Sequence, residues 1–197
     1  LDTLETDKGA WLVYRTVEQG KATVDLLPQL VEQALAALPI PKRMRWGAYR
    51  TEFVRPVHWV VLLYGNQVIN TPIMGLTPGN KTRGHRFHCP EPLIVPTPND
   101  YEVVLKQEGH VLADFAERRE QIRAGVEALA ERETGGRAVI DEDLLDEVTA
   151  LNEWPVPLMG RFEERFLAVP PEALISSMKE HQKYFHVVDR DGRMLPL

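Results

Sequence analysis

Residues 57–74, VHWVVLLYGNQVINTPIM, decide the fold class of this chain. The first half, residues 57–64, consists mainly of β-branched, aromatic and aliphatic side chains, which are typical of a strand. Gly65 and Asn66 then form a two-residue turn signal, and a second run follows over residues 67–74. This order predicts an antiparallel β-hairpin.

Apolar residues recur at helical spacing in four other stretches, and Pro or Gly ends most of these patterns. Gly109 divides the longest pattern, and Asp141 stands where a side chain can cap the following helix. Further short apolar runs predict strands. The predicted helices are residues 24–38, 100–133, 141–151 and 171–181, and the predicted strands outside the hairpin are residues 11–15, 155–160, 184–188 and 193–197.

Helices and strands mix without the regular strand–helix–strand rhythm of a parallel sheet, so the sequence predicts an α+β fold. A length of 197 residues suits one domain with a sizeable hydrophobic core. We expect a single domain over residues 1–197, with a helical insertion at about residues 100–151 as an alternative organisation. The first residue is Leu1 rather than Met, and the chain reads as a segment of a longer polypeptide.

Composition narrows the class of protein. Hydrophobic residues make up 44% and charged residues 26% of the chain, which is typical of a globular protein rather than a disordered one. No apolar run approaches the roughly 18 residues of a membrane-spanning helix. Cys89 is the only cysteine, so an intrachain disulfide is excluded, and we expect a reducing, cytoplasmic location.

The charge distribution is uneven. The formal net charge of the chain is −6, yet residues 42–86 contain eight Lys or Arg and a single acid, Glu52. Such a reversal of sign predicts a surface for a polyanion, and nucleic acid is one candidate. The alternative is that these cations form ordinary surface charge or pair with the acidic helices.

Motifs for independent catalysis are missing from the sequence. Neither the phosphate-binding pattern GxxxxGK[ST] nor GxGxxG after a strand occurs. His85, His88 and Cys89 lie close together but lack a second ligand cluster, so a metal site is the weaker interpretation of them. His181, His186 and Asp189, and the acid run at residues 141–147, likewise match no catalytic or EF-hand spacing. We expect no catalytic residue, no metal and no cofactor in this segment.

Two strings within residues 42–86 combine cations with an aromatic residue. Residues 39–47, PIPKRMRWG, place three cations in a proline-stiffened loop that ends near Trp46, and residues 82–87, TRGHRF, repeat the combination around Phe87. Arginine can donate to two phosphate oxygens at once, and an aromatic ring can stack on a base. Core packing is the alternative for each ring, and we prefer it for each ring taken singly.

These strings resemble the bacterial glycyl-tRNA synthetase β-subunit family. The resemblance begins at residues 6–9 (TDKG) and continues in order along essentially the whole chain. Each string is short, and their succession in one order makes the resemblance specific. The strings are LPIPK at 38–42, MRWG at 44–47, FVRPVH at 53–58, RGHRF at 83–87, EWPV at 153–156, FEERFLAVP at 162–170, and MK with QKYF at 178–185.

The resemblance implies an internal fragment from the N-terminal half of a β subunit. It implies an α+β domain with a β-rich core and flanking helices, similar to the B3/B4-type domain of the phenylalanyl-tRNA synthetase β subunit. In this family the α subunit carries the class II catalytic core, so ATP and magnesium are expected there. The implied partners are the α subunit, glycine tRNA and the other domains of the β chain.

Three roles follow as hypotheses. The first is a non-catalytic structural and tRNA-contacting domain of glycine–tRNA ligase. The second is a scaffold that binds the α subunit or another β domain without touching RNA. The third, an editing domain that deacylates mischarged tRNA, has no supporting motif. The candidate tRNA-binding residues are Lys42, Arg43, Arg45, Arg50, Arg55, Lys81, Arg83, His85 and Arg86.

Overall fold

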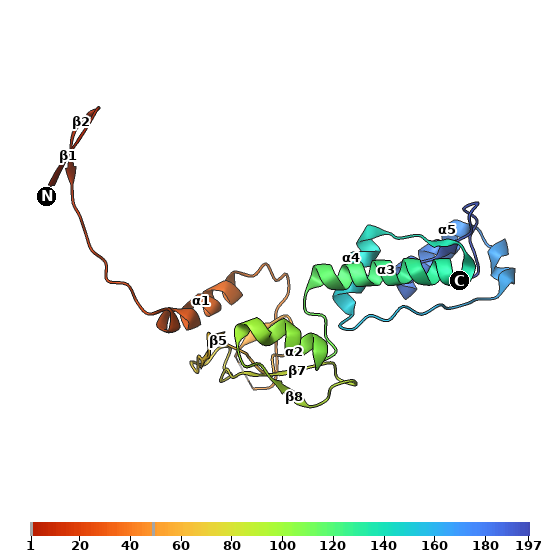
Figure 1. Ribbon diagram of the computed structural model, residues 1–197, viewed down its shortest axis with the longest axis horizontal. Coiled ribbons are helices and arrows are strands. Elements are labelled where there is room, and N and C mark those ends of the chain that lie inside the picture. The colour runs from red at the N-terminus through yellow and green to blue at the C-terminus, as the bar shows by residue number, and fades with distance from the viewer. Residues whose placement is uncertain (1, 49) are drawn as a thin grey trace. The chain divides into compact units, whose positions relative to one another are not determined.

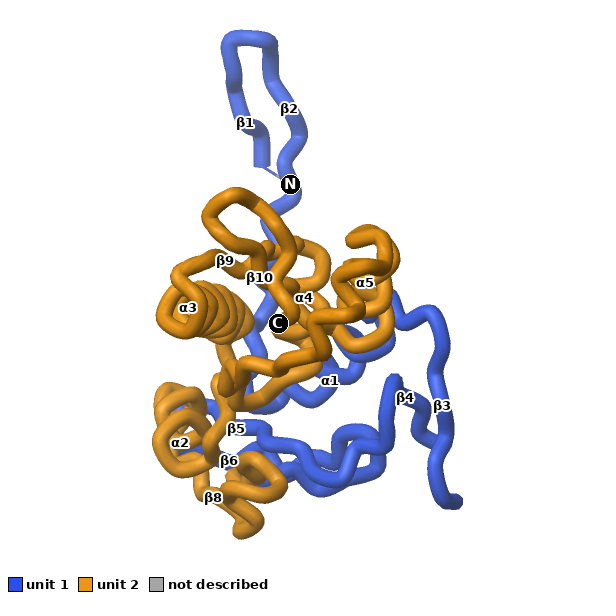
Figure 2. The backbone as a smooth tube through the Cα atoms, turned by 90° about the vertical axis from the view of Figure 1, so that its right-hand side faces the viewer, with its two compact units in different colours: residues 1–79 blue, residues 80–197 orange. Residues whose placement is uncertain are grey.

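The computed structural model describes residues 2–48 and 50–197. The chain divides into two compact units, residues 1–79 and residues 80–197, which are coloured separately in Figure 2. Helices and short antiparallel strands occur in both units, so the α+β prediction is confirmed (Figure 1). Among the described residues the strands form five two-stranded sheets rather than one β-rich core. The prediction of a single domain stays a prediction.

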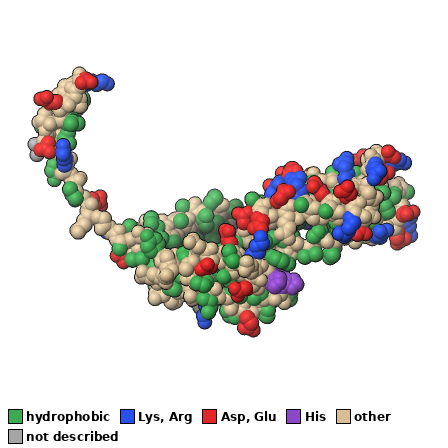
Figure 3. All heavy atoms as spheres, viewed as in Figure 1, with side chains coloured by type: hydrophobic (Ala, Val, Ile, Leu, Met, Phe, Trp, Pro, Cys, Tyr) green, Lys and Arg blue, Asp and Glu red, His purple; other side chains and the backbone are tan. Residues whose placement is uncertain are grey.

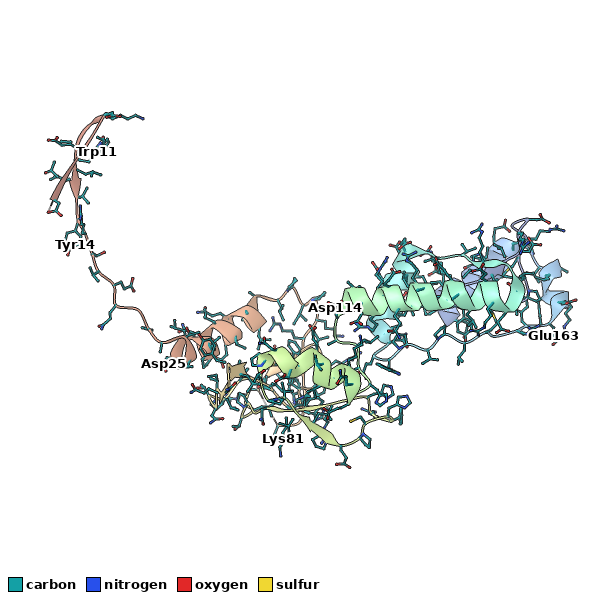
Figure 4. The ribbon with its side chains drawn as sticks, viewed as in Figure 1. Trp11, Tyr14, Asp25, Lys81, Asp114 and Glu163 are labelled. Atoms are coloured by element: carbon teal, nitrogen blue, oxygen red, sulfur yellow. The ribbon has the colours of Figure 1, made fainter. Side chains whose placement is uncertain are left out.

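The first unit begins with a β-hairpin. Strands β1 (Asp2–Thr6) and β2 (Gly9–Val13) pair in antiparallel register, with Leu4 opposite Trp11. Gly9 has a φ of +118°, a conformation that favours glycine at this tight turn. Trp11 is 58% exposed, and Figure 4 labels it together with Tyr14, which is also exposed and follows the hairpin.

Helix α1 (Thr23–Ala37) confirms the helical prediction for residues 24–38. Two short sheets follow it in this unit, and the predicted turn at Gly65 and Asn66 joins the strands of the second. That hairpin is confirmed, although its ladder is short and is extended by the bond from the Ile69 N–H to the Leu62 carbonyl. The strands are β3 (Met44–Arg45), β4 (Glu52–Phe53), β5 (Leu63–Tyr64) and β6 (Gln67–Val68).

The second unit opens with strands β7 (Lys81–Arg83) and β8 (Pro92–Ile94), which pair with Thr82 opposite Leu93. A 3-10 turn, η1 (Pro98–Asp100), leads into helix α2 (Tyr101–Gln107). Buried Leu93, Val95 and Leu105 form part of the apolar interior of this unit.

The long helical pattern predicted over residues 100–133 is two helices, α2 and α3 (Phe115–Thr134), as Gly109 suggested. His110 has a φ of +52°, which a continuous helix cannot accommodate. The Asp114 carboxylate accepts the Glu117 N–H at 2.6 Å and thereby caps α3, at the position labelled in Figure 4. Gly135 ends α3 in the left-handed conformation.

The remaining elements complete the second unit. Helix α4 (Glu142–Leu151) starts at the predicted cap, because the Asp141 carboxylate accepts the Leu144 N–H at 2.9 Å. The π-helical turn, η3 (Ser177–Gln182), ends at Lys183, whose φ is +60°. The other elements are β9 (Arg137–Ala138), η2 (Glu164–Ala168), α5 (Pro171–Ser176) and β10 (Val187–Val188), which pairs with β9.

Two predicted strands are wrong. Residues 155–160 form no strand, because Pro155 and Pro157 lack the N–H that a ladder needs. Residues 193–197 contribute only an isolated bridge between Met194 and Val188. Among the helices of the described residues, none is both long enough and apolar enough to cross a membrane.

Candidate nucleic-acid interface

The first unit carries five of the candidate cations, and three of them are open. Lys42, Arg50 and Arg55 are exposed, and none has a side-chain hydrogen bond or ion pair within the described part of the chain. Each therefore has its charge available to an external anion.

Arg43 and Arg45 are bound to the protein itself. The Arg43 Nη2 donates to the carbonyl oxygens of Leu35 and Ala36, at 3.3 and 3.1 Å, and at 3.5 Å to that of Leu38. Helix α1 has no basic residue in its last turn, so Arg43 supplies the donors that its carboxyl end lacks. Arg45 Nε lies 2.5 Å from Glu52 Oε1, across the β3–β4 pair.

The second unit presents Lys81, Arg83 and Arg86 around the loop that joins β7 to β8. Lys81 and Arg83 are exposed on one face of β7, while Thr82 between them is buried, as the alternation of a strand requires. Figure 4 labels Lys81 on this strand. Arg83 Nη1 donates to the Pro90 carbonyl at 3.2 Å, whereas exposed Lys81 and Arg86 make no side-chain bond to described residues.

His85 organises this loop from its centre, a role that sequence reasoning missed. Its Nδ1 accepts the N–H groups of Phe87 and His88 at 3.3 and 3.4 Å, and its carbonyl accepts the Cys89 N–H at 2.8 Å. Its own N–H donates to the Gly109 carbonyl at 2.6 Å. His85 is partly buried, and because its Nδ1 accepts two backbone N–H groups, its imidazole serves first as a structural acceptor.

Gly84 permits the close approach of the loop to the end of α2. A Cβ at this position would lie 2.5 Å from the Gly109 carbonyl oxygen and 2.6 Å from the Gly109 Cα. Real Cβ atoms do not reach such distances from backbone, so a larger residue requires the backbone to move. No local sequence signal predicts this contact, because the two glycines are separated by helix α2 and strand β8.

Four ring contacts join residues 85, 87, 88, 110 and 154, which we call the aromatic ladder. The ring centroids are 6.0 Å apart for Phe87 and His85, and 4.5 Å apart for His85 and His88. His88 and His110 are 5.5 Å apart, and His110 and Trp154 form a T-shaped pair at 5.3 Å. Histidine side chains form a visible group on the face in Figure 3.

The histidine rings of the ladder contact one another at tilted angles, 31° for His85 and His88 and 38° for His88 and His110. No group of three or more His, Cys, Asp or Glu side chains suited to a metal ion occurs within residues 2–48 and 50–197. The His85 Nδ1 already accepts two N–H groups, and Cys89 Sγ lies 3.7 Å from the Glu91 carbonyl. The arrangement therefore offers ring faces and cations instead of a ligand set.

Four of the five acids at residues 141–147 form ion pairs within their own unit. Arg119 bonds to Glu142 and Asp146, both at 2.5 Å, and Arg123 bonds to Glu142 at 2.5 Å. Hydrogen bonds from Arg123 and Arg119 lower the pKa of Glu142, and the bond to Asp146, followed by that to Glu142, raises the pKa of Arg119. Acidic and basic side chains are accordingly interspersed over the helices in Figure 3.

The same pairing continues at both ends of α4. Lys179 Nζ donates to Asp141 at 2.6 Å, and Lys183 Nζ donates to Glu147 at 2.8 Å. The bond from Lys179 lowers the pKa of Asp141, and the Leu144 N–H adds to this effect. The acidic helix is thus a solvated face held by ion pairs.

His186 and Asp189 form no acid–base pair. Burial lowers the pKa of His186, and the nearby positive charge of Arg137 lowers it further, so its neutral form is favoured. Asp189 instead accepts the N–H groups of Asp191 and Arg193, at 2.9 and 2.8 Å, and organises the turn before the C-terminal residues.

An apolar groove of about 810 Å³ lies in the second unit. One wall is α3, where Ile122 and Val126 contribute side chains, and another is the extended segment at residues 155–162. Leu158 lines this groove and is 87% exposed. Residues 174–187 contribute further lining, with Met178 and Phe185 among them, and Val148, Phe166 and Leu197 also line the groove.

Comparison with known proteins assigns the family. The model of the glycyl-tRNA synthetase beta subunit matches residues 1–197. The glycine–tRNA ligase beta subunit of Marinobacter nauticus is 83% identical over 197 residues, and that of Hahella chejuensis is 63% identical over 196 residues; both alignments cover 100% of this chain. The protein of the same name from Chromohalobacter salexigens is 58% identical over 195 residues, or 98% of the chain. The chain spans 28% of the length of each of these relatives. It belongs to the glycyl-tRNA synthetase beta subunit family.

Proposed function

We propose that this segment is a non-catalytic, tRNA-contacting part of glycine–tRNA ligase. The complete enzyme would use ATP to attach glycine to its tRNA, and the α subunit would hold ATP and magnesium. The segment would act in the cytoplasm, beside the α subunit and the other domains of the β chain. We also propose that the segment resembles in fold the B3/B4-type domain of the phenylalanyl-tRNA synthetase β subunit.

The observation that carries the proposal is the set of open cations within a family of tRNA ligases. Lys42, Arg50, Arg55, Lys81 and Arg86 are exposed and bind no acid of the described chain, although the chain as a whole is acidic. Phosphate contacts by such side chains release counterions, so affinity for RNA falls steeply with salt. Arg43 and Arg45 have structural partners, and we assign them a smaller share of RNA binding.

The test measures binding of glycine tRNA to the full α–β complex across a series of salt concentrations. The triple variant Lys42→Ala, Arg55→Ala, Arg86→Ala should lose roughly 10- to 100-fold in affinity, and its salt slope should fall by about two to three. A matched control replaces three exposed but ion-paired arginines, Arg132, Arg165 and Arg193, by Ala.

The control variant should bind tRNA like the parent protein. Equal affinities and equal salt slopes for the parent and the Lys42–Arg55–Arg86 variant would overturn the tRNA-contact proposal. An equal loss in both triple variants would also contradict it, because the effect would then follow net charge and not the open cations.

A second function is favoured by the apolar groove. We propose that another segment of the longer β chain packs against it, since the chain spans 28% of its relatives and exposes Leu158 and Val156 there. Leu158→Asp should destabilise the full β subunit, whereas Ile94→Asp, at a site 58% exposed outside the groove, should have little effect. Equal thermal stability of the two variants would contradict this packing.

A further inference from the structure

The loop between β7 and β8 presents an aromatic ring to solvent. Phe87 is 83% exposed, so the expectation that it packs in the core is wrong. Leaving a ring of this size in water forgoes the free energy of its burial. Single exposed apolar side chains are common on protein surfaces, so the exposure of Phe87 points to a ligand only together with the hydrogen-bonded loop and the neighbouring cations.

That backbone is fixed by hydrogen bonds on both sides of the ring. The Phe87 N–H and the His88 N–H both donate to His85 Nδ1, and the His85 N–H donates to the Gly109 carbonyl. The loop is therefore organised before any ligand arrives, which reduces the entropy lost on binding.

The surroundings of Phe87 favour a base over an apolar peptide. Arg86 directly precedes it and is exposed without a partner among the described residues, and exposed Lys81 and Arg83 lie on β7 just before the loop. The rings of His85 and His88 continue the aromatic ladder behind Phe87. Cations beside a free ring face match a nucleotide, whose phosphate is anionic and whose base is flat.

We propose that Phe87 stacks on an unpaired base of the tRNA, while Arg86 contacts the adjoining phosphate. This inference rests on the proposed tRNA-contact function and adds the kind of nucleotide and the residue that reads it. The nucleotide lies in a single-stranded part of the tRNA, because the face of a base inside a duplex is covered by its neighbours.

The experiment uses the full α–β complex, glycine tRNA and four single variants, three at Phe87 and one at Arg86. Phe87→Ala should weaken binding about 5- to 100-fold, with the salt slope unchanged because no charge is removed. Phe87→Leu should resemble Phe87→Ala, since it keeps apolar bulk but has no ring. Phe87→Tyr should bind within about threefold of the parent protein.

Arg86→Ala provides the contrasting signature. It should reduce the salt slope by about 0.7 to 0.9, as expected for the loss of one phosphate contact. Size-exclusion chromatography of each variant establishes whether the α–β complex stays intact.

Three outcomes would overturn the stacking inference. Equal affinity of Phe87→Ala, Phe87→Leu and the parent protein would do so, and so would full affinity of Phe87→Leu alone. Dissociation of the α–β complex by Phe87→Ala would assign the ring to a protein contact. If the Phe87 variants bind like the parent protein while the triple variant Lys42→Ala, Arg55→Ala, Arg86→Ala loses affinity, only the stacking inference is contradicted. If neither the Phe87 variants nor the triple variant changes binding, the tRNA-contact proposal is contradicted as well.

Discussion

The α3–α4 helices and the β7–β8 loop use arginine in opposite ways. On the helices, Arg119 and Arg123 bind Glu142 at 2.5 Å, so their charges are consumed within the fold. In the loop, Arg86 has no acid partner among the described residues, and backbone bonds to His85 and Gly109 maintain the local structure instead. Residue counts treat these arginines alike; the difference lies in what each guanidinium contacts.

The largest expected effect comes from breaking the support of the loop. Gly84→Ala places a Cβ against the Gly109 backbone and should lower the free energy of unfolding by about 3 kcal/mol. Urea denaturation checks this value. Gly160→Ala is the control, because nothing lies within 4 Å of the point that its new Cβ would occupy; a loss as small as that of the control would show that the loop tolerates displacement.

Reversing an open charge should affect RNA binding without affecting folding. Arg86→Glu should weaken binding of glycine tRNA to the full α–β complex about 10-fold, since a phosphate contact becomes a repulsion. Its melting temperature should stay that of the parent, because the side chain makes no bond to the described residues that would be lost. Arg132→Glu, at an arginine paired with Glu133, is the control for charge alone.

Variants of Asp141 test helix α4, where we expect charged side chains to contribute to stability and not to RNA binding. Asp141→Ala removes the cap of α4 and should cost about 1 kcal/mol in urea denaturation, with tRNA affinity unchanged. Asp141→Asn retains an oxygen that can accept the Leu144 N–H, so its loss should be smaller. A loss of tRNA affinity in either variant would break the proposed separation between stability and binding.

The pH dependence of Asp141 has a definite sign. Lys179 and the Leu144 N–H lower its pKa in the folded state below the ordinary value of 3.8. The folded state therefore binds fewer protons, and this contribution to stability is complete above pH 3.8 and is lost as the pH falls through the lower folded value. Asp141→Asn should flatten the stability curve below pH 3.8, where the folded and unfolded states of the parent protein differ in protonation.

The smallest effect is expected from releasing paired arginines. Glu142→Gln releases Arg123 from this carboxylate, while Arg119 keeps its bond to Asp146, and it should lower the melting temperature by less than about 2 °C, because the glutamate is exposed. If ion pairing is what prevents these arginines from binding RNA, tRNA affinity should rise slightly in this variant, by less than about twofold. A fall in affinity would contradict the comparison.

Local sequence signals predicted the elements that local interactions determine. The hairpin turn at Gly65 and Asn66, the cap at Asp141 and the break near Gly109 each depend on residues close in sequence, and all three are confirmed. The strand predicted at residues 155–160 was wrong because its prolines outweigh its apolar character.

The candidate site depended on contacts between distant residues, which no local pattern encodes. Gly84 meets Gly109 although strand β8 and helix α2 separate them in sequence, and the adjoining bond from the His85 N–H to the Gly109 carbonyl helps to fix the position of His85. Arg43 and Arg86 look equivalent in the sequence, yet the end of α1 uses the first, while the second binds none of the described residues. The proposed RNA contacts of the nine candidate residues stay predictions.

Lys183 has a left-handed backbone conformation, and its side chain also joins the segment before the C-terminal residues to helix α4. Its left-handed conformation costs a non-glycine residue about 1 kcal/mol, while its ammonium reaches Glu147 on α4 at 2.8 Å. Glycine at this position would release the backbone strain and remove the tether in a single step. Position 183 therefore holds two opposing contributions, a strained backbone and an ion pair that joins this segment to helix α4.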